Sequence, residues 1–217
     1  MFYMKIQLAL DRLQIEEAIT MARRVADSVD WLEVGTSLVK EFGMESVRAM
    51  RKAFPGHTIL ADMKINDNAR YECALAFDAG ADVVTVMAVA PIVTIEIVQE
   101  MAQKMQKQYM IDLLNAPLSL QNKLKERFCD AIFCLHTSKD EQEEKVLNES
   151  KAIMDWKGRR VAVAGGVTLE RIPELIELCR PEIFIVGGAI TKAEQPEIMA
   201  GHFKQTLKFQ RTIKEQG

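Results

Sequence analysis

A lysine flanked by two carboxylates stands in the motif DMKIND at residues 62–67, directly after a short apolar segment. If this segment is a β-strand, its side chains alternate between two faces, so Asp62 and Lys64 point to one side and Met63 to the other. Met63 suits a face covered by helices, which leaves Asp62 and Lys64 facing inward. Burial of unpaired ions is costly, and neighbouring carboxylates favour the charged form of a lysine. The motif predicts a paired ammonium group inside a cavity, with a structural salt bridge as the alternative.

Glu33 lies in another apolar run, which we expect to form the strand beside the one that carries Asp62. Two carboxylates that converge at the ends of neighbouring strands make a hard-oxygen site suited to Mg²⁺, completed by water and ligand oxygens. Such an ion acts as a Lewis acid on a carbonyl and its neighbouring hydroxyl. We predict Mg²⁺ at Glu33 and Asp62. Zinc fits less well, because no group of histidines and cysteines has the spacing for it.

His136 ends a third strand-like run. A neutral imidazole there could remove a proton from a carbon next to a carbonyl group. The other two histidines, His57 in a turn and His202 in the last helix, are most simply surface residues. The alternative for His136 is a histidine that only makes structural hydrogen bonds.

Two glycine pairs, Gly165-Gly166 and Gly187-Gly188, follow the last two strand-like runs. Glycine lets backbone N–H groups approach an anion closely. Phosphate sites in the loops after the seventh and eighth strands recur in (β/α)₈ barrels. The pairs therefore predict a phosphate site, with tight turns as the alternative.

Eight apolar runs rich in β-branched residues must position these groups. They lie at residues 5–10, 31–34, 58–63, 82–87, 109–114, 131–135, 160–164 and 182–186. Amphipathic segments such as 15–26 and 94–105 separate them, an alternation typical of βαβ units and a parallel sheet. Eight units without a dividing linker predict one (β/α)₈ TIM barrel over residues 1–217. A doubly wound open sheet is the alternative, but its usual glycine fingerprint after the first strand is missing.

In such a barrel the active site lies at the carboxyl ends of the strands. Asp11 ends the first run and Asp112 lies in the fifth, so both are candidate substrate-binding residues. The fourth run has neither an ionisable group nor a glycine pair at its exit.

Composition excludes several other classes of protein. Lysine and arginine total 28 against 31 acidic residues, for a net charge of −3, which does not suit a nucleic-acid-binding surface. No apolar stretch approaches the roughly 18 residues of a membrane span, and the N-terminal residues lack the features of a signal peptide. The four cysteines form no CxxC pair, so we expect a cytoplasmic protein without disulfides.

The sequence resembles the orotidine monophosphate decarboxylase superfamily over nearly its whole length. The segments that carry the resemblance are LALD ending at Asp11, EVGT at 33–36, DxKxxD at 62–67, FDAGAD at 77–82, His136, AGGV at 164–167 and VGGAI at 186–190. The combination of EVGT with DxKxxD is specific, whereas each glycine motif alone is not. The sequence is most similar to the branch that contains 3-hexulose-6-phosphate synthases and 3-keto-L-gulonate-6-phosphate decarboxylases.

The resemblance implies roles for several residues. Glu33 and Asp62 would hold Mg²⁺, Lys64 would stabilise an enediolate oxygen, and His136 would act as the acid and base. The glycine pairs would bind phosphate. The resemblance also implies a homodimer in which Asp67 reaches the neighbouring subunit's site.

The branch is chosen on three positions. Asp112 and Gly188 resemble the synthases, because the decarboxylases usually have Glu and Arg there. Lys139, a further candidate substrate-binding residue, places a cation where the decarboxylases have an arginine. We therefore expect aldol addition of formaldehyde to ribulose 5-phosphate, with decarboxylation of 3-keto-L-gulonate 6-phosphate as the alternative. A sugar-phosphate epimerase and a non-catalytic sugar-phosphate-binding protein are the more distant alternatives.

The sequence also departs from the family pattern at two loops. Asn68-Ala69 replace a small residue and glycine, and Asn115-Ala116-Pro117 replace a turn that contains glycine. Both changes bear on loop geometry and substrate preference, while the positions of Glu33, Asp62 and Lys64 are kept.

Overall fold

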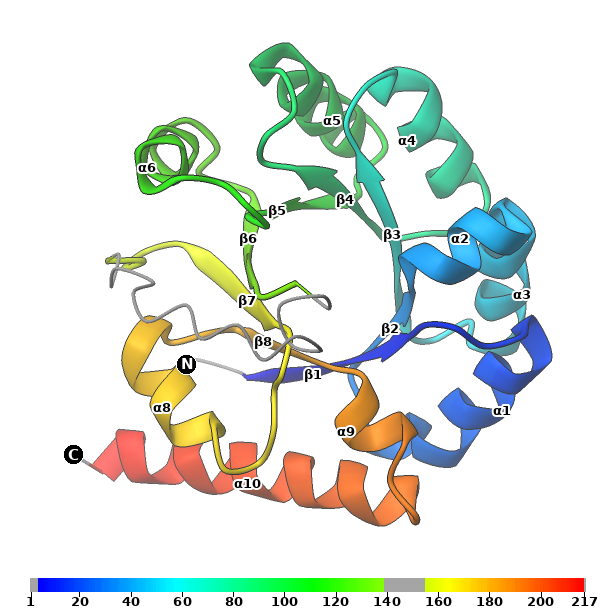
Figure 1. Ribbon diagram of the computed structural model, residues 1–217, viewed down its shortest axis with the longest axis vertical. Helices are drawn as coiled ribbons and strands as arrows, with labels where there is room; N and C mark the ends of the chain where they lie inside the picture. Colours follow the sequence, from blue (N-terminus) through cyan, green and yellow to red (C-terminus); the bar gives the residue numbers. More distant parts are fainter. Residues whose placement is uncertain (1–3, 139–154, 217) are drawn as a thin grey trace.

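Eight parallel strands follow one another around a closed barrel in chain order, and β8 pairs with β1 (Figure 1). The computed structural model describes residues 4–138 and 155–216, with side chains described up to residue 210. The strands are β1 Lys5–Leu10, β2 Trp31–Val34, β3 Thr58–Ile65, β4 Val83–Met87, β5 Gln108–Asp112, β6 Ile132–His136, β7 Arg160–Ala164 and β8 Ile183–Val186. The predicted (β/α)₈ barrel is confirmed, and each observed strand overlaps a predicted run.

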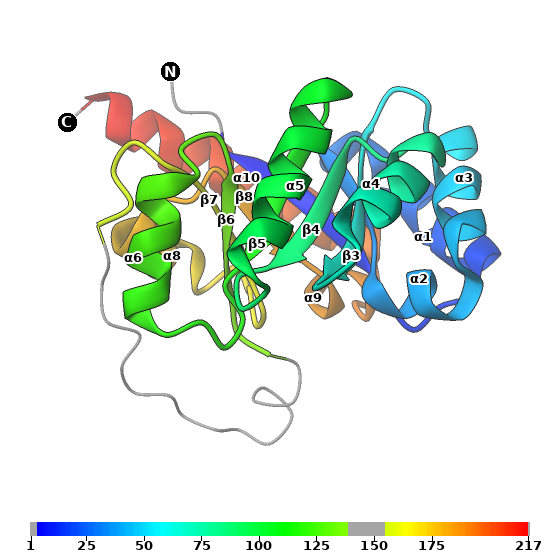
Figure 2. The ribbon, with the colours of Figure 1, turned by 90° about the horizontal axis from the view of Figure 1, so that it is seen from above.

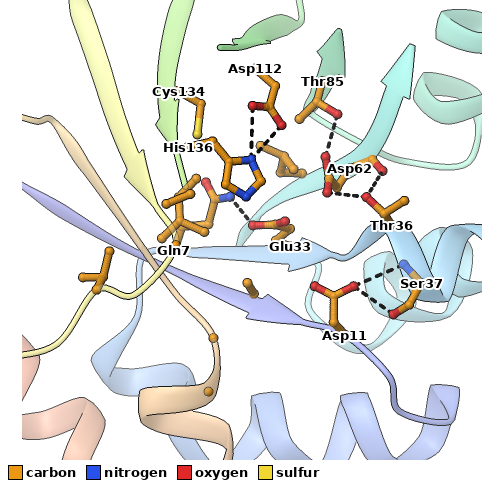
Figure 3. A pocket seen from close by; sticks show the side chains of 18 of the residues that line it. Gln7, Asp11, Glu33, Thr36, Ser37, Asp62, Thr85, Asp112, Cys134 and His136 are labelled. Atoms are coloured by element: carbon orange, nitrogen blue, oxygen red, sulfur yellow. Dashed lines mark hydrogen bonds and ion pairs between the residues drawn. The ribbon is translucent and has the colours of Figure 1, made fainter. Parts of the chain in front are cut away.

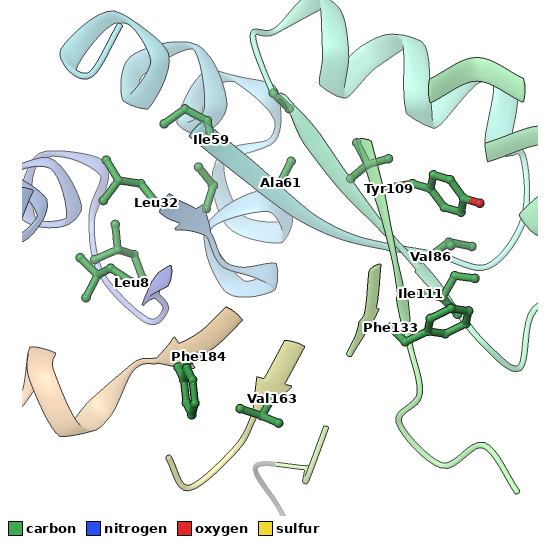
Figure 4. Packing of buried hydrophobic residues seen from close by; sticks show 14 of the residues in the cluster. Leu8, Leu32, Ile59, Ala61, Val86, Tyr109, Ile111, Phe133, Val163 and Phe184 are labelled. Atoms are coloured by element: carbon green, nitrogen blue, oxygen red, sulfur yellow. The ribbon is translucent and has the colours of Figure 1, made fainter. Parts of the chain in front are cut away.

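Side chains alternate between the inside and the outside of the barrel, apart from an irregularity in β3 between Ala61 and Ile65. Outward residues such as Leu8, Leu32 and Phe184 are fully buried and pack under the surrounding helices (Figure 4). Inward residues such as Trp31 and Met110 form a second buried cluster within the barrel. Strands buried on both faces explain why the sequence shows near-continuous apolar runs instead of alternating polarity.

The helices form the outer ring, and their bounds are α1 Ile15–Val25, α2 Thr36–Phe42, α3 Met44–Ala53, α4 Ala69–Asp78, α5 Ile92–Lys104, α6 Leu118–Arg127, α8 Ile172–Cys179, α9 Gly188–Thr191 and α10 Pro196–Gln216, with a 3₁₀ turn η1 at Ala26–Ser28. Helix α1 begins where the Gln14 backbone N–H donates to the Glu17 carboxylate, which lies three residues on, at 2.8 Å. Within the described part of the chain, every helix is too short or too polar to cross a bilayer.

An ion cluster closes the barrel at the amino ends of the strands. Glu182 accepts hydrogen bonds from Lys5 Nζ at 2.7 Å and from Arg160 Nε at 2.8 Å, and Arg160 also donates to the Gln108 side chain at 2.7 Å. Burial alone would raise the pKa of Glu182, but these two cations lower it to about 2. The cluster therefore fills the end of the barrel opposite to the predicted active site.

Candidate active site

A cavity of about 920 Å³ opens at the carboxyl ends of the strands. Its size is in the range of pockets for small-molecule ligands. Ten of the predicted site residues line it: Asp11, Glu33, Asp62, Lys64, Asp112, His136, Gly165, Gly166, Gly187 and Gly188. These groups come from β2, β3, β5 and β6, from the end of β1 and from the loops after β7 and β8, and they lie up to 177 positions apart in the sequence.

Lys64 lies between two carboxylates on the inside of the barrel. Its Nζ atom is 3.0 Å from Oδ2 of Asp62 and 3.0 Å from Oδ2 of Asp112. Burial would lower the pKa of this lysine, but the two negative charges outweigh burial and raise it above the usual value. Lys64 is therefore a fixed ammonium group, as the alternation along the strand predicts.

The backbone of β3 is irregular at this lysine. Lys64 has a left-handed φ of +48°, and the pairing of β3 with β4 shifts register between Ala61 and Ile65. Thr85 on β4 stabilises this bulge, because its Oγ1 accepts the Lys64 backbone N–H at 2.8 Å and donates to Asp62 Oδ1 at 2.8 Å. The sequence reasoning missed Thr85, although it is the one polar residue in the run VVTVM.

Glu33 is 7% exposed and faces the cavity from β2 (Figure 3). Gln7 on β1 donates from Nε2 to Glu33 Oε2 at 2.6 Å. Burial, followed by the negative charges of Asp62 and Asp11, raises the pKa of Glu33 well above its usual value. Glu33, Asp62 and Asp11 thus bring three carboxylates together, and the single positive charge of Lys64 does not balance them fully.

This arrangement fits a divalent cation. The Oε1 atom of Gln7 is buried and has no hydrogen-bond partner among the described residues, so a further polar group is missing from the floor of the cavity. A hard cation with bound water beside Glu33 and Asp62 would offset the carboxylate repulsion. Gln7 was also missed from the sequence, although an inward polar residue within the apolar run KIQLAL is a usable signal.

Asp112 holds His136 as well as Lys64. The Nδ1 atom of His136 lies 2.9 Å from Asp112 Oδ2 and 3.1 Å from Oδ1. Burial would raise the pKa of Asp112, but the hydrogen bond and charge of His136, together with Lys64, lower it to about 2. The sequence analysis placed Asp112 beside the substrate, whereas the structure also makes it the group that orients the predicted base.

Cys134 adds a soft ligand to this wall of the cavity. One ligand atom from each of Asp112, Cys134 and His136 lies within 4.8 Å of the other two. The sequence analysis considered zinc less suitable from spacing along the chain, and it did not find this group. Spacing along the chain could not reveal this group, because Asp112 comes from a neighbouring strand.

Asp11 is held at the rim of the cavity by α2. Its Oδ1 accepts hydrogen bonds from Ser37 Oγ at 2.8 Å and from the Ser37 backbone N–H at 3.1 Å. The neighbouring Thr36 donates to Asp62 Oδ2 at 2.5 Å. Helix α2 thus begins with two hydroxyl side chains that fix two of the carboxylates.

Only the first of the two glycine pairs has a backbone conformation that favours glycine. Gly165 and Gly166 have φ values of +87° and +66°, which strain any residue with a side chain. Both pairs line the cavity, on the side of β7 and β8.

One predicted residue is not brought into the cavity of its own chain, and the position of another is not described. Asp67 is exposed in the loop before α4 and does not line the cavity of its own chain. Lys139 lies outside the described residues.

Comparison of the sequence with known protein families shows which family of (β/α)₈ barrels has this site. Residues 4–201 match the orotidine 5'-phosphate decarboxylase / HUMPS family, so the chain is a member of that family. A protein of Bacillus subtilis (strain 168) named 3-hexulose-6-phosphate synthase is 36% identical over 211 residues, which cover 94% of this chain and 99% of that protein. The resemblance inferred from the sequence motifs is confirmed.

Solved structures agree with this assignment. The crystal structure of 3-hexulose-6-phosphate synthase from Salmonella typhimurium is 35% identical, with a TM-score of 0.87 over 94% of this chain and 98% of that one. The structure of 3-keto-L-gulonate-6-phosphate decarboxylase from Vibrio cholerae O1 biovar El Tor str. N16961 is 27% identical, with a TM-score of 0.83 over 95% of this chain and 98% of that one.

Proposed function

We propose that this chain is a 3-hexulose-6-phosphate synthase, an aldehyde-lyase that adds formaldehyde to ribulose 5-phosphate through an enediolate. The observation that carries the proposal is the Lys64 ammonium group held between Asp62 and Asp112 in the same cavity as Glu33 and His136. The 36% identity to a synthase over nearly the whole of both chains supports the choice of reaction.

The reaction requires a proton to leave C1 of the pentulose. His136 would remove it, because it lines the cavity and Asp112 orients its ring through Nδ1. Lys64 would stabilise the enediolate oxygen by charge, since an ammonium group already fixed in place by two carboxylates needs no reorganisation when the negative charge develops. The enediolate carbon would then attack formaldehyde, and the alkoxide of the product would take up a proton.

Glu33 and Asp62 would hold Mg²⁺, which supplies a Lewis acid for the C2 carbonyl and C3 hydroxyl oxygens. Asp11 would position a substrate hydroxyl. The loops with Gly165, Gly166, Gly187 and Gly188 would bind the phosphate. Lys139 is a further candidate substrate-binding residue.

We also propose a homodimer in which Asp67 reaches the partner's cavity. In its own chain Asp67 is exposed next to α4, and apolar side chains are exposed along α4 and α5: Tyr71 and Val93 are 60% and 58% exposed. These two helices lie side by side on the outside of the barrel (Figure 2). Exposed apolar side chains gathered on one face are typical of protein–protein interfaces.

The dimer is tested by mixing two inactive variants, Lys64→Ala and Asp67→Ala. In a random mixture half of the dimers contain one chain of each kind, and one of their two sites has both residues intact, so about a quarter of wild-type activity returns. Lack of any recovery, with mixed dimers verified by mass spectrometry, would contradict a shared site.

The activity itself is tested with Mg²⁺ and a panel of pentulose and ketohexonate phosphates read by mass spectrometry. We expect formaldehyde consumption with ribulose 5-phosphate. Release of CO₂ from 3-keto-L-gulonate 6-phosphate without formaldehyde uptake would favour the decarboxylase instead. Binding of phosphate ligands in calorimetry without turnover of any substrate would favour a binding protein. Exchange of the C1 proton with solvent that is undiminished in Lys64→Ala would remove the lysine from its role.

A further inference from the structure

The cavity contains a second set of ligands, of a different chemical character from the carboxylates at Glu33 and Asp62. Asp112 on β5 is the register partner of Cys134 on β6, so their side chains project inward side by side. His136 is two residues beyond Cys134 on the same strand and therefore faces the same way. Figure 3 shows the three side chains on one wall of the cavity, with Glu33 facing them.

The geometry of these three side chains suits a tetrahedral ion. Their ligand atoms lie within 4.8 Å of one another, and all three residues line the cavity. Ligand atoms around a tetrahedral zinc ion are about 3.5 Å apart, so the three atoms would have to move closer by side-chain rotation, and water or substrate would be the fourth ligand.

Cys134 decides which ion would bind. Sulfur and imidazole ligands select zinc, cobalt or cadmium, whereas Mg²⁺ takes oxygen ligands almost exclusively. The cavity thus has a hard-oxygen wall around Glu33 and Asp62 and a softer wall around Cys134 and His136.

We propose that Asp112, Cys134 and His136 form a second cation site, selective for thiophilic divalent ions such as Zn²⁺, whose occupation inhibits the enzyme. On binding, the thiol of Cys134 releases its proton to solvent and a metal–sulfur bond forms, with no change in oxidation state. The ion takes a ring nitrogen of His136 and a carboxylate oxygen of Asp112, and Lys64 keeps Asp62 as its partner. Only the inhibitory part rests on the proposed function, because binding depends on the ligands alone.

Binding is tested by adding Co²⁺ to the metal-free protein and recording its absorption spectrum. We expect a thiolate-to-cobalt charge-transfer band that saturates at one ion per chain. The matched control is Cys129→Ser, which removes an exposed thiol outside the cavity and should leave the band unchanged. In Cys134→Ser and in Cys134→Ala the band should be lost, with circular dichroism verifying the fold. A wild-type protein without the band, or a band that survives in a folded Cys134 variant, would overturn the site.

Inhibition is tested by titrating Zn²⁺ against activity at low and at saturating Mg²⁺. If zinc acts at Cys134, excess Mg²⁺ does not relieve inhibition, and Cys134→Ala raises the inhibitory zinc concentration about 10- to 100-fold relative to its own uninhibited rate. Full relief by Mg²⁺ with no effect of the substitution would place the inhibitory zinc at Glu33 and Asp62 and overturn the inhibitory role. The cobalt spectrum separates this result from a failure of the proposed activity, since it requires no substrate.

Discussion

Oδ2 of Asp112 lies 2.9 Å from Nδ1 of His136, so a carboxylate on β5 orients an imidazole on β6. The same oxygen lies 3.0 Å from Nζ of Lys64. One buried carboxylate thus fixes both the proposed base and the proposed electrostatic group. This sharing explains why its pKa is held near 2 in spite of burial.

Replacement of Asp112 by Asn should therefore disable two groups at once. The amide cannot stabilise a protonated His136 by charge, and Lys64 loses one of its two negative partners. We expect kcat to fall by about 10²- to 10⁴-fold, the usual contribution of a positioned acid–base group, measured by steady-state formaldehyde uptake. Asp112→Glu keeps the charge and serves as the control, with a smaller loss. Equal activity of the Asn variant and the wild type would show that Asp112 is not needed for orientation.

Glu33 should make the metal-free protein less stable at neutral pH. Its folded-state pKa is raised by burial and by Asp62 and Asp11. A raised folded-state pKa gives stability that is present below the unfolded value of about 4.3 and is lost as the pH rises through the folded value. We expect Glu33→Gln to melt about 2–4 °C higher than the wild type at pH 8 in EDTA, which corresponds to about 1 kcal/mol in a chain of this length.

The difference between Glu33→Gln and the wild type should shrink as the pH is lowered toward 5, and Mg²⁺ should raise the melting temperature of the wild type alone. Differential scanning calorimetry measures the melting temperature of both proteins at pH 8 and at pH 5, in EDTA and with Mg²⁺. If Glu33→Gln melts lower than the wild type at pH 8 in EDTA, repulsion between the carboxylates does not destabilise the metal-free protein.

Gly35, between β2 and α2, has no room for a side chain. An added Cβ would lie 2.4 Å from Cγ of Asp11 and 2.4 Å from the Leu10 carbonyl oxygen. We expect Gly35→Ala to displace Asp11 and to cost about 1–3 kcal/mol of stability through overpacking, as measured by urea unfolding. Gly56→Ala is the matched control, because nothing lies within 4 Å of its added Cβ. Two alanine variants of equal stability would be incompatible with this contact.

The ion cluster at the closed end of the barrel should respond to acid. The pKa of Glu182 is lowered to about 2, so its contribution to stability is present above the unfolded pKa and is lost as the pH falls through the folded one. We expect Glu182→Gln to lower the free energy of unfolding by about 2 kcal/mol at pH 6, which is less than the full lowering of the pKa implies because solvent screens this partly buried group. The difference should diminish between pH 4 and pH 2 in urea unfolding. A difference that does not depend on pH would show that loss of packing, and not charge, is responsible.

The sequence was sufficient for the barrel, because apolar strands buried on both faces and amphipathic helices leave strong patterns. It was also sufficient for most cavity residues, since a carboxylate at a strand exit is unusual in an apolar context. Asp62 and Lys64 could be placed on one face by alternation alone. What alternation cannot reveal is the bulge at Lys64, which depends on a hydrogen bond to Thr85 on another strand.

The site residues that the sequence analysis missed are those whose role depends on contacts between strands. Gln7 and Thr85 are single polar residues in apolar runs, and their meaning depends on which carboxylate stands opposite. The same holds for Cys134, whose neighbour Asp112 is set by strand register. The shared active site implied by Asp67 remains a prediction, since it concerns a second chain.

The left-handed backbone at Lys64 has a thermodynamic consequence. A non-glycine residue in this conformation costs about 1–3 kcal/mol, which a glycine would largely recover. Glycine, however, has no ammonium group to place between Asp62 and Asp112. Relaxing the main chain at this residue would therefore leave two buried carboxylates without their cation, so the strained backbone persists because the side chain it carries is needed for both stability and chemistry.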